Sequence, residues 1–310
     1  MQQPRDTAVK ASLPELIALQ ADARALRLPA HRPVRQPLAG QRQSPLRGRG
    51  MAFAEVRLYQ PGDDSRTIDW RVTARRQAPH TKLFEEEKER PLLLICDLGP
   101  SLFFGSVHCY KQVRTAQAAA LLAWLGLWQG DQVGGVVFNH QALHLLRPAR
   151  RRQTVMQLLD RLASDQLEKL DGADAGTSRL DDALREARRI AHTGSRIIIL
   201  SDFLSLSAES TSLLATLSAH NSVSALRIQD PLEISLPDRG RFAITLGKDT
   251  LWFNAADRQL RAAFADQVSA REAAFTQTLR SAGIGWLTLG TQDDPASVVR
   301  QLLGTRGTLR

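Results

Sequence analysis

Hydrophobic positions along the chain fall into short continuous runs, separated by longer stretches with a helical period. The run from Leu92 to Cys96 is too short for a buried helix and is followed by Gly99 and Pro100, which turn the chain. Such a run predicts a strand buried on both faces. Similar runs predict further strands at residues 133–138, 197–201, 223–228 and 284–289.

The stretches between these strands carry apolar side chains at the spacing of amphipathic helices. They predict helices at residues 116–127, 180–191, 255–282 and 295–303, and a helix that begins within 147–152. Strands that alternate with helices predict an open, mostly parallel α/β sheet flanked by helices, with ligand chemistry at the strand ends. Residues 142–146 are expected to form a hairpin with the strand before them, and a hairpin excursion is expected near 236–254.

The pattern is different upstream of this sheet. Residues 13–28 predict an amphipathic helix with Ser12 as its N-cap, followed by a proline- and arginine-rich linker that we expect to be extended or mobile. Residues 53–59 alternate as in a strand with one apolar face, and Ile68 and Trp70 are expected to return toward a core. The predicted organisation is an N-terminal helix and linker at 1–47, a small β-containing region at 48–90 and an α/β domain at 91–310.

The charge of the chain is strongly basic, with a formal net charge of +9 and no acidic residue between Ala23 and Ala54. Such an excess favours acidic partners, nucleic acid or anionic membranes. The amino terminus lacks the apolar core of a signal peptide, and the longest apolar run, 116–128, is shorter than a spanning helix requires. Cys96 and Cys109 match no metal or redox spacing and fit a reducing compartment. We therefore expect a cytoplasmic protein without membrane insertion.

Candidate chemistry lies where the first core strand ends. Asp97 is the last strand residue and Ser101 follows on the same loop, so that two oxygen ligands lie where Mg²⁺ is held at the carboxyl ends of parallel strands. The alternative is that both side chains only satisfy backbone donors of the turn and cap the next helix. The strand at 197–201 repeats the pattern, because Asp202 follows it.

Other function classes have weaker support. No Gly-x-Ser-x-Gly motif surrounds Ser101, and Phe103 stands where its second glycine would be, which argues against a hydrolase. No phosphate-binding loop of the Gly-x-x-x-x-Gly-Lys type occurs, so ATP hydrolysis would have to come from a partner. Nucleic-acid binding is the alternative function, because the arginine-rich linker could neutralise phosphates. Against it, the basic cluster at 147–152 has no interleaved aromatic side chain for base stacking.

In their order and context, four residues resemble the metal-ion-dependent adhesion site of von Willebrand factor A domains: Asp97, Ser101, Thr177 and Asp202. The resemblance implies a von Willebrand factor A-like, Rossmann-like fold in which Asp97 and Ser101 face a Mg²⁺ ion. It also implies that Thr177 binds the ion directly or through water, and that Asp202 binds it through water. Gly99 departs from the pattern because it stands where the first serine ligand would be, and a water would have to replace that hydroxyl.

A second set of residues resembles the signature of the bacterial family called domain of unknown function 58. The set comprises Glu55, Arg57, Tyr59, Gly62, Asp63, Asp64, Arg66, Asp69, Trp70 and Arg75. On their own, these closely spaced and nearly balanced charges favour a paired polar network over a catalytic group. The segment from Asp230 to Glu233 also resembles the family pattern after a later strand, and the match extends over residues 40–303.

This resemblance implies a non-enzymatic interaction or adaptor protein. Genes of the family commonly neighbour MoxR-type AAA+ ATPases, and such pairs are thought to act in chaperone-like activation or assembly of client proteins. The implied mechanism is docking, in which an under-coordinated Mg²⁺ takes a carboxylate from a partner while basic patches steer an acidic surface into place. The signature residues are the second candidate contact, and nucleic acid is not the expected partner.

Overall fold

The computed structural model describes residues 6–26, 51–60, 68–86, 91–169, 179–246 and 249–304. The chain divides into two compact units: Met1–Pro29 together with Arg90–Arg310, and Ala30–Glu89. The N-terminal helices, which we expected in a region of their own, therefore belong to the larger unit. The proline- and arginine-rich linker predicted after residue 28 lies outside the described residues.

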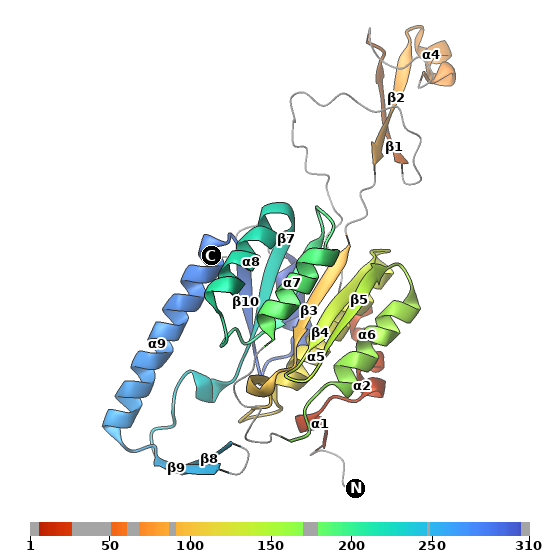
Figure 1. Cartoon of the computed structure of the whole chain (residues 1–310). Coiled ribbons are helices and arrows are strands. Elements are labelled where there is room, and N and C mark those ends of the chain that lie inside the picture. Colours follow the sequence, from red (N-terminus) through yellow and green to blue (C-terminus); the bar gives the residue numbers. More distant parts are fainter. Residues whose placement is uncertain are drawn as a thin grey trace. The chain divides into compact units, whose positions relative to one another are not determined.

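The larger unit is built on a six-stranded sheet with the strand order β10-β7-β6-β3-β4-β5 (Figure 1). Its strands are β3 Leu92–Asp97, β4 Val133–Phe138, β5 Leu143–Ala149, β6 Arg196–Ser201, β7 Ser222–Gln229 and β10 Gly285–Gly290. The β4–β5 pair is antiparallel, as the predicted hairpin requires, and every other pair is parallel. Counted within this sheet, the order is the doubly wound 3-2-1-4-5-6, which reverses between β3 and β6. The predicted open, mostly parallel α/β sheet is confirmed.

Helices cover both faces of this sheet (Figure 1). They are α5 Lys111–Trp128, α6 Arg152–Ser164 and α10 Pro295–Gly304 on one face, and α7 Leu180–Ile190, α8 Ala208–His220 and α9 Arg258–Ser281 on the other. Alternate residues of β3 pack into the hydrophobic cores on the two faces of the sheet. Leu94 and Cys96 lie in one core, and Leu93 and Ile95 lie in the other. This strand is therefore buried on both faces, as predicted.

Three short helices near the N-terminus pack against α5 and α6: α1 Asp6–Val9, α2 Leu13–Ala18 and α3 Gln20–Ala25. The predicted helix over 13–28 is interrupted at Leu19, and Ser12 is its N-cap, as predicted. The Trp124 Nε1 of α5 donates a hydrogen bond of 3.1 Å to the Leu16 carbonyl oxygen. Because Leu16 and Trp124 are both fully buried, these helices complete the first core.

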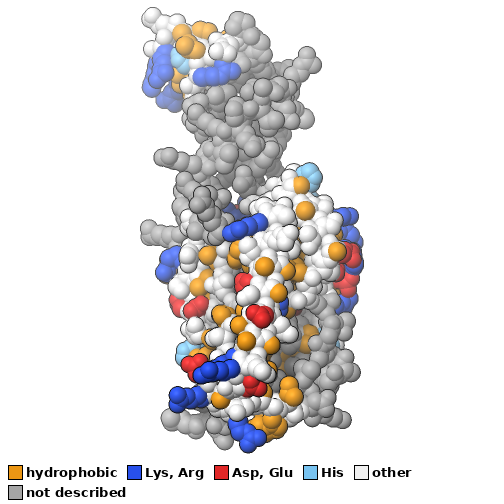
Figure 2. All heavy atoms as spheres, turned by 90° about the vertical axis from the view of Figure 1, so that its left-hand side faces the viewer, with side chains coloured by type: hydrophobic (Ala, Val, Ile, Leu, Met, Phe, Trp, Pro, Cys, Tyr) orange, Lys and Arg blue, Asp and Glu red, His pale blue; other side chains and the backbone are white. Residues whose placement is uncertain are grey.

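The excursion predicted near 236–254 is the antiparallel hairpin of β8 Arg241–Leu246 and β9 Asp249–Asn254. Its side chains Leu251 and Trp252 are 68% and 66% exposed. On the face that carries α9, hydrophobic side chains are interspersed with charges of both signs (Figure 2). Among the helices that the structure describes, none combines the length and the apolar character needed to span a membrane.

In the described part of the smaller unit, β1 Met51–Leu58 pairs antiparallel with β2 His80–Glu86, and the helix α4 Trp70–Arg76 lies between them in sequence. Asp69 caps α4, because its Oδ1 accepts hydrogen bonds from the backbone N–H groups of Arg71 and Val72. The strand predicted at 53–59 is confirmed, whereas β2 was not predicted. The expectation that Trp70 returns to a core is wrong: it begins α4 and is 70% exposed.

Candidate functional site

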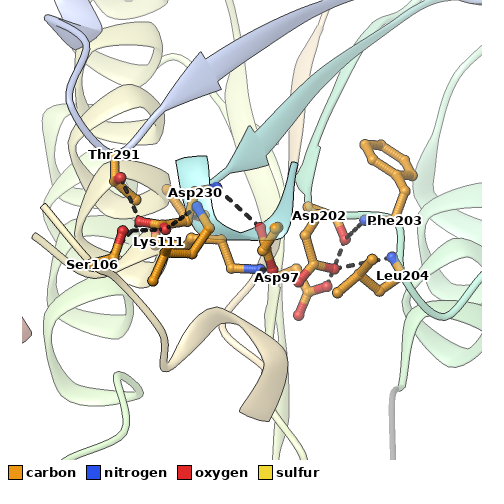
Figure 3. A network of polar contacts seen from close by, with 12 residues as sticks. Asp97, Ser106, Lys111, Asp202, Phe203, Leu204, Asp230 and Thr291 are labelled. Carbon is orange, nitrogen blue, oxygen red and sulfur yellow. Dashed lines mark hydrogen bonds and ion pairs between the residues drawn. The ribbon is translucent and has the colours of Figure 1, made fainter. Parts of the chain in front are cut away.

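The strand order defines where a ligand site is expected. In an open α/β sheet, sites form beyond the carboxyl ends of the strands, at the point where the strand order reverses. Here that point lies between β3 and β6, whose last residues are Asp97 and Ser201, and Asp202 follows directly. Figure 3 shows the polar side chains that gather at this rim. We call Asp97, Ser201, Asp202, Lys111 and Glu233 the switch-point site.

Asp97 joins the ends of the two central strands. Its Oδ1 accepts a 2.8 Å hydrogen bond from the Gly99 N–H, and its Oδ2 accepts one of 2.7 Å from the Ser201 hydroxyl. The side chain is buried, and burial together with the neighbouring charge of Asp202 raises the pKa of Asp97 to about 7. A carboxyl group in this setting is partly protonated at neutral pH.

Gly99 lies in close contact with the Asp97 carboxylate. A Cβ atom built at this position would lie 3.0 Å from Asp97 Oδ1, which is tighter than nine in ten real Cβ contacts. The same oxygen accepts the Gly99 N–H, so the turn is wrapped closely around the carboxylate. A serine here would require the Asp97 side chain to shift by a few tenths of an ångström.

Lys111 is the cation of the site. It is the first residue of α5 and is fully buried, and its Nζ lies 2.8 Å from Asp202 Oδ2 and 2.6 Å from Glu233 Oε1. Glu233 ends the short 3₁₀ helix η3 Pro231–Glu233, which follows β7. Burial acts to lower the pKa of Lys111, but the charges of Asp202 and Glu233 outweigh it and raise the pKa above its ordinary value. The ammonium group therefore stays charged.

A second buried carboxylate, Asp230, lies at the end of β7. Its Oδ2 accepts hydrogen bonds from the Ser106 N–H at 2.8 Å and from the Thr291 hydroxyl at 2.7 Å. Its Oδ1 accepts from the Ser106 hydroxyl and from the Leu232 N–H. Burial acts to raise the pKa of Asp230, but the hydrogen bonds from Ser106, Thr291 and Leu232 outweigh it and lower the pKa. We call Asp230, Ser106 and Thr291 the hydroxyl cluster (Figure 3).

The structure brings together two of the four predicted metal ligands, Asp97 and Asp202, whose charges act on one another. Ser101 lies on the 3₁₀ helix η2 Pro100–Leu102 and is exposed, and no described residue forms a hydrogen bond with its hydroxyl. Thr177 lies outside the described residues. Lys111 and Glu233 were not predicted as members of the site. Lys111 stands upstream of the helix start expected at 116, and Glu233 was noted only as part of a family pattern.

The structure describes some of the signature residues and leaves others undescribed. Asp69 caps α4, and Trp70 and Arg75 on α4 are exposed. Arg57 donates a 3.0 Å hydrogen bond to the Leu58 carbonyl oxygen, and Tyr59 N–H pairs with the Pro79 carbonyl. The remaining members lie outside the described residues or have undescribed side chains: Glu55, Gly62, Asp63, Asp64 and Arg66.

A Mg²⁺ ion at this rim would need near-octahedral oxygen ligands, several of them waters. Both oxygens of Asp97 accept hydrogen bonds, Asp202 Oδ1 accepts one from the Leu204 N–H, and Asp202 Oδ2 binds Lys111. Across the described ranges, no three His, Cys, Asp or Glu side chains are grouped as a metal site requires. The described residues therefore do not fit a bound Mg²⁺, and the Mg²⁺ site, which also relied on Thr177, stays a prediction.

Fold and site together define a doubly wound α/β protein whose switch-point carboxylates are paired with a lysine of the same chain. The chain belongs to the family described as "Protein of unknown function DUF58", which matches residues 55–274. The suspected family resemblance is thereby confirmed.

Two curated relatives differ in how much of the chain they match. "Uncharacterized protein Rv1480" of Mycobacterium tuberculosis (strain ATCC 25618 / H37Rv) is 30% identical over 290 residues, which cover 93% of this chain and 90% of that protein. "Uncharacterized protein YeaD" of Bacillus subtilis (strain 168) is 35% identical over 104 residues, 30% of this chain and 25% of that protein. The mycobacterial relative therefore extends over both units.

Solved structures show only distant likeness. The protein BatB from Bacteroides thetaiotaomicron is 14% identical, with a TM-score of 0.43, and the match covers 68% of this chain and 96% of that one. A von Willebrand factor type A structure from Catenulispora acidiphila is 12% identical, with a TM-score of 0.39, over 72% of this chain and 43% of that one. At these scores the likenesses support no conclusion, and the fold follows from the strand order.

Proposed function

We propose that this chain is a non-enzymatic adaptor that docks a partner protein at the rim formed by the switch-point site. The observation that carries the proposal is the mutual pairing of the polar groups there. Asp97 accepts hydrogen bonds from the Gly99 N–H and the Ser201 hydroxyl, and Lys111 pairs with Asp202 and Glu233. Because these groups are already paired with one another, none of them is a free reactive group of the kind that a reaction centre needs within reach of a substrate.

The proposed partner is a MoxR-type AAA+ ATPase acting in the cytoplasm, with this chain helping it to activate or assemble client proteins. Membership of the family supports the proposal, because family genes commonly neighbour such ATPases. The chain has no phosphate-binding loop motif, so the ATPase would supply the ATP hydrolysis. The net charge of +9 favours an acidic docking surface on the partner. The Mg²⁺ ion expected from the sequence has no part in this proposal, because Lys111 already pairs with Asp202 at the rim.

The test is binding of the full chain to a purified MoxR-type AAA+ ATPase from the same organism, followed by surface plasmon resonance. We expect Asp97→Asn with Asp202→Asn to weaken binding about tenfold or more, because the rim loses its charge pattern. Asp238→Asn is the control for loss of an exposed carboxylate outside the switch-point site, since Asp238 is almost fully exposed. Circular dichroism and the unfolding midpoint show whether the double variant is folded.

A folded double variant that binds the ATPase as tightly as the unchanged chain would refute docking at the rim. The signature residues on α4, Trp70 and Arg75, would then be the next contact to substitute. Absence of binding by the unchanged chain would refute the choice of partner.

Nucleic-acid binding is a second candidate function, and one observation favours it. On α4, the exposed ring of Trp70 is accompanied by three exposed basic side chains, Arg71, Arg75 and Arg76. An aromatic surface with neighbouring arginines is the combination that binds single-stranded nucleic acid. Binding of a fluorescent oligonucleotide that falls steeply with salt, and falls further in Trp70→Ala, would support this function in place of the adaptor role.

A further inference from the structure

The cation at the switch-point site comes from the chain itself. Lys111 is fully buried, and its ammonium group bridges Asp202 at 2.8 Å and Glu233 at 2.6 Å. These are the distances of charge-assisted hydrogen bonds. The two carboxylates follow different strands, β6 and β7, so a single ammonium group holds two separate loops to the start of α5.

From this geometry we infer that Lys111 takes the place of a divalent metal ion at the rim, with Asp202 and Glu233 as its carboxylate partners. An ammonium group neutralises and orients carboxylates from separate loops, as a metal ion does, and it offers three donors and no acceptor. A Mg²⁺ ion in the same space would meet a positive charge within a few ångströms. The inference concerns the cation alone and does not rest on the proposed function.

The carboxylate oxygens that do not bind Lys111 also accept hydrogen bonds. Asp97 accepts hydrogen bonds at both oxygens, from Gly99 and Ser201, and Asp202 Oδ1 accepts one of 3.1 Å from the Leu204 N–H. A metal ion would have to displace these donors or share the oxygens with them. The loss of donors from buried carboxylates is costly, so the existing arrangement competes with metal binding.

The pocket beside the site leaves little room for a hydrated ion. This narrow pocket is lined by Asp202 and Glu233, together with Arg227 and Glu272. Arg227 is 7% exposed, and its Nη1 lies 2.5 Å from Glu272 Oε1, so that these two charges compensate one another. A hydrated Mg²⁺ ion retains several waters, and a pocket this narrow cannot accommodate them.

The position of Lys111 in its helix supports the same role. A lysine at a helix N-terminus is disfavoured by the helix dipole, which suits negative groups there. Asp202 and Glu233 supply that negative charge from outside the helix. Their carboxylates therefore offset the positive charge of Lys111 as well as that of the helix N-terminus. The helix α5 contains no acidic residue, so it offers Lys111 no comparable partner of its own.

The experiment is thermal unfolding of the full chain with EDTA, with millimolar MgCl₂ or MnCl₂, and with NaCl at matched ionic strength. We expect the midpoint of the unchanged chain to be the same in all four solutions. Lys111→Ala opens a space among the carboxylates of Asp97, Asp202 and Glu233, and we expect MgCl₂ or MnCl₂ to raise its midpoint by about 2 °C or more. Adding Asp202→Asn to this variant is expected to abolish the rise.

Controls make each outcome decisive. Lys10→Ala removes a lysine whose partner Glu168 is exposed, and its midpoint should not respond to either metal. A rise in the midpoint of the unchanged chain with MgCl₂, beyond that with NaCl, overturns the inference. A folded Lys111→Ala variant without a metal response overturns it as well. Should that variant fail to fold, calorimetric titration of MnCl₂ into the unchanged chain still decides, because measurable binding contradicts a resident ammonium.

Discussion

Two buried carboxylate clusters lie at the strand ends of the larger unit, and they are stabilised in different ways. In the switch-point site, Asp97 and Asp202 share one rim, and the compensating charge is the ammonium group of Lys111. In the hydroxyl cluster, Asp230 has no nearby cation among its described contacts and is held by hydroxyl and backbone donors. One cluster is stabilised by charge and the other by hydrogen bonds.

The pKa directions show what this difference means. Asp97 and Asp230 are both almost fully buried, yet the pKa of Asp97 is raised and that of Asp230 is lowered. Asp97 has two donors and a like charge beside it, whereas Asp230 has four donors. Burial and the like charge of Asp202 outweigh the two donors of Asp97, whereas the four donors of Asp230 outweigh its burial.

The largest expected effect comes from removing the charge that holds the first cluster. Lys111→Met keeps much of the side-chain volume but leaves Asp202 and Glu233 without their partner. Removing one member of a buried ion pair typically costs about 3–5 kcal/mol. We expect a loss of this size in the free energy of unfolding, measured by urea denaturation at neutral pH.

Lys10→Met is the matched control for this prediction. Lys10 pairs with Glu168 at 2.8 Å, but that carboxylate is 76% exposed. Exposed pairs contribute little because water and salt screen them, so the control should leave the urea midpoint unchanged. Equal, small effects of the two substitutions would show that Lys111 is not the stabilising charge of the site.

An intermediate effect is expected in the hydroxyl cluster. Thr291→Val preserves the shape of a fully buried side chain but removes the hydroxyl that donates to Asp230. A hydrogen bond to a charged group is worth about 1.5–3 kcal/mol, and we expect a loss of about 2 kcal/mol in the free energy of unfolding. Thr216→Val is the control, since its hydroxyl is exposed and donates within α8. If both variants unfold at the same urea concentration, donors do not stabilise Asp230 as inferred.

The strands of the six-stranded sheet were predictable, because they follow from local patterns such as the continuous apolar runs of β3 and β6. The meeting of Asp97 with Asp202 was implied by the family resemblance, since local patterns do not show which strands are neighbours. Once β3 and β6 are parallel neighbours, their ends lie at one edge of the sheet. By contrast, α8 was missed because its buried leucines stand among serines and threonines that weaken the apolar pattern.

The cation of the site could not be predicted in this way. Lys111 and Glu233 lie 122 residues apart in sequence, and their meeting depends on how α5 and η3 pack at the rim. A lysine before an apolar helix is indistinguishable in sequence from an ordinary solvated residue. Burial distinguishes Lys111 from a solvated lysine, and only the folded structure shows that Lys111 is buried.

The smallest expected effect is a pH dependence at Asp97. Its pKa in the folded chain is about 7, above the ordinary value of 3.8, so the folded state binds the proton more tightly than the unfolded state. The stability that this proton contributes is complete below the ordinary pKa and is lost as the pH rises through about 7. Asp97→Asn resembles the protonated side chain and removes this dependence.

The measurable quantity is the difference in free energy of unfolding between the unchanged chain and Asp97→Asn, determined in EDTA. Between about pH 6 and about pH 8 we expect the unchanged chain to lose about 1.4 kcal/mol relative to the variant. Asp230→Asn should show no such loss over this window, because the pKa of Asp230 is lowered and the group stays ionised throughout. A difference that stays constant with pH would mean that burial and the like charge of Asp202 do not raise the pKa of Asp97, and the contrast between the two clusters would then reduce to their numbers of donors.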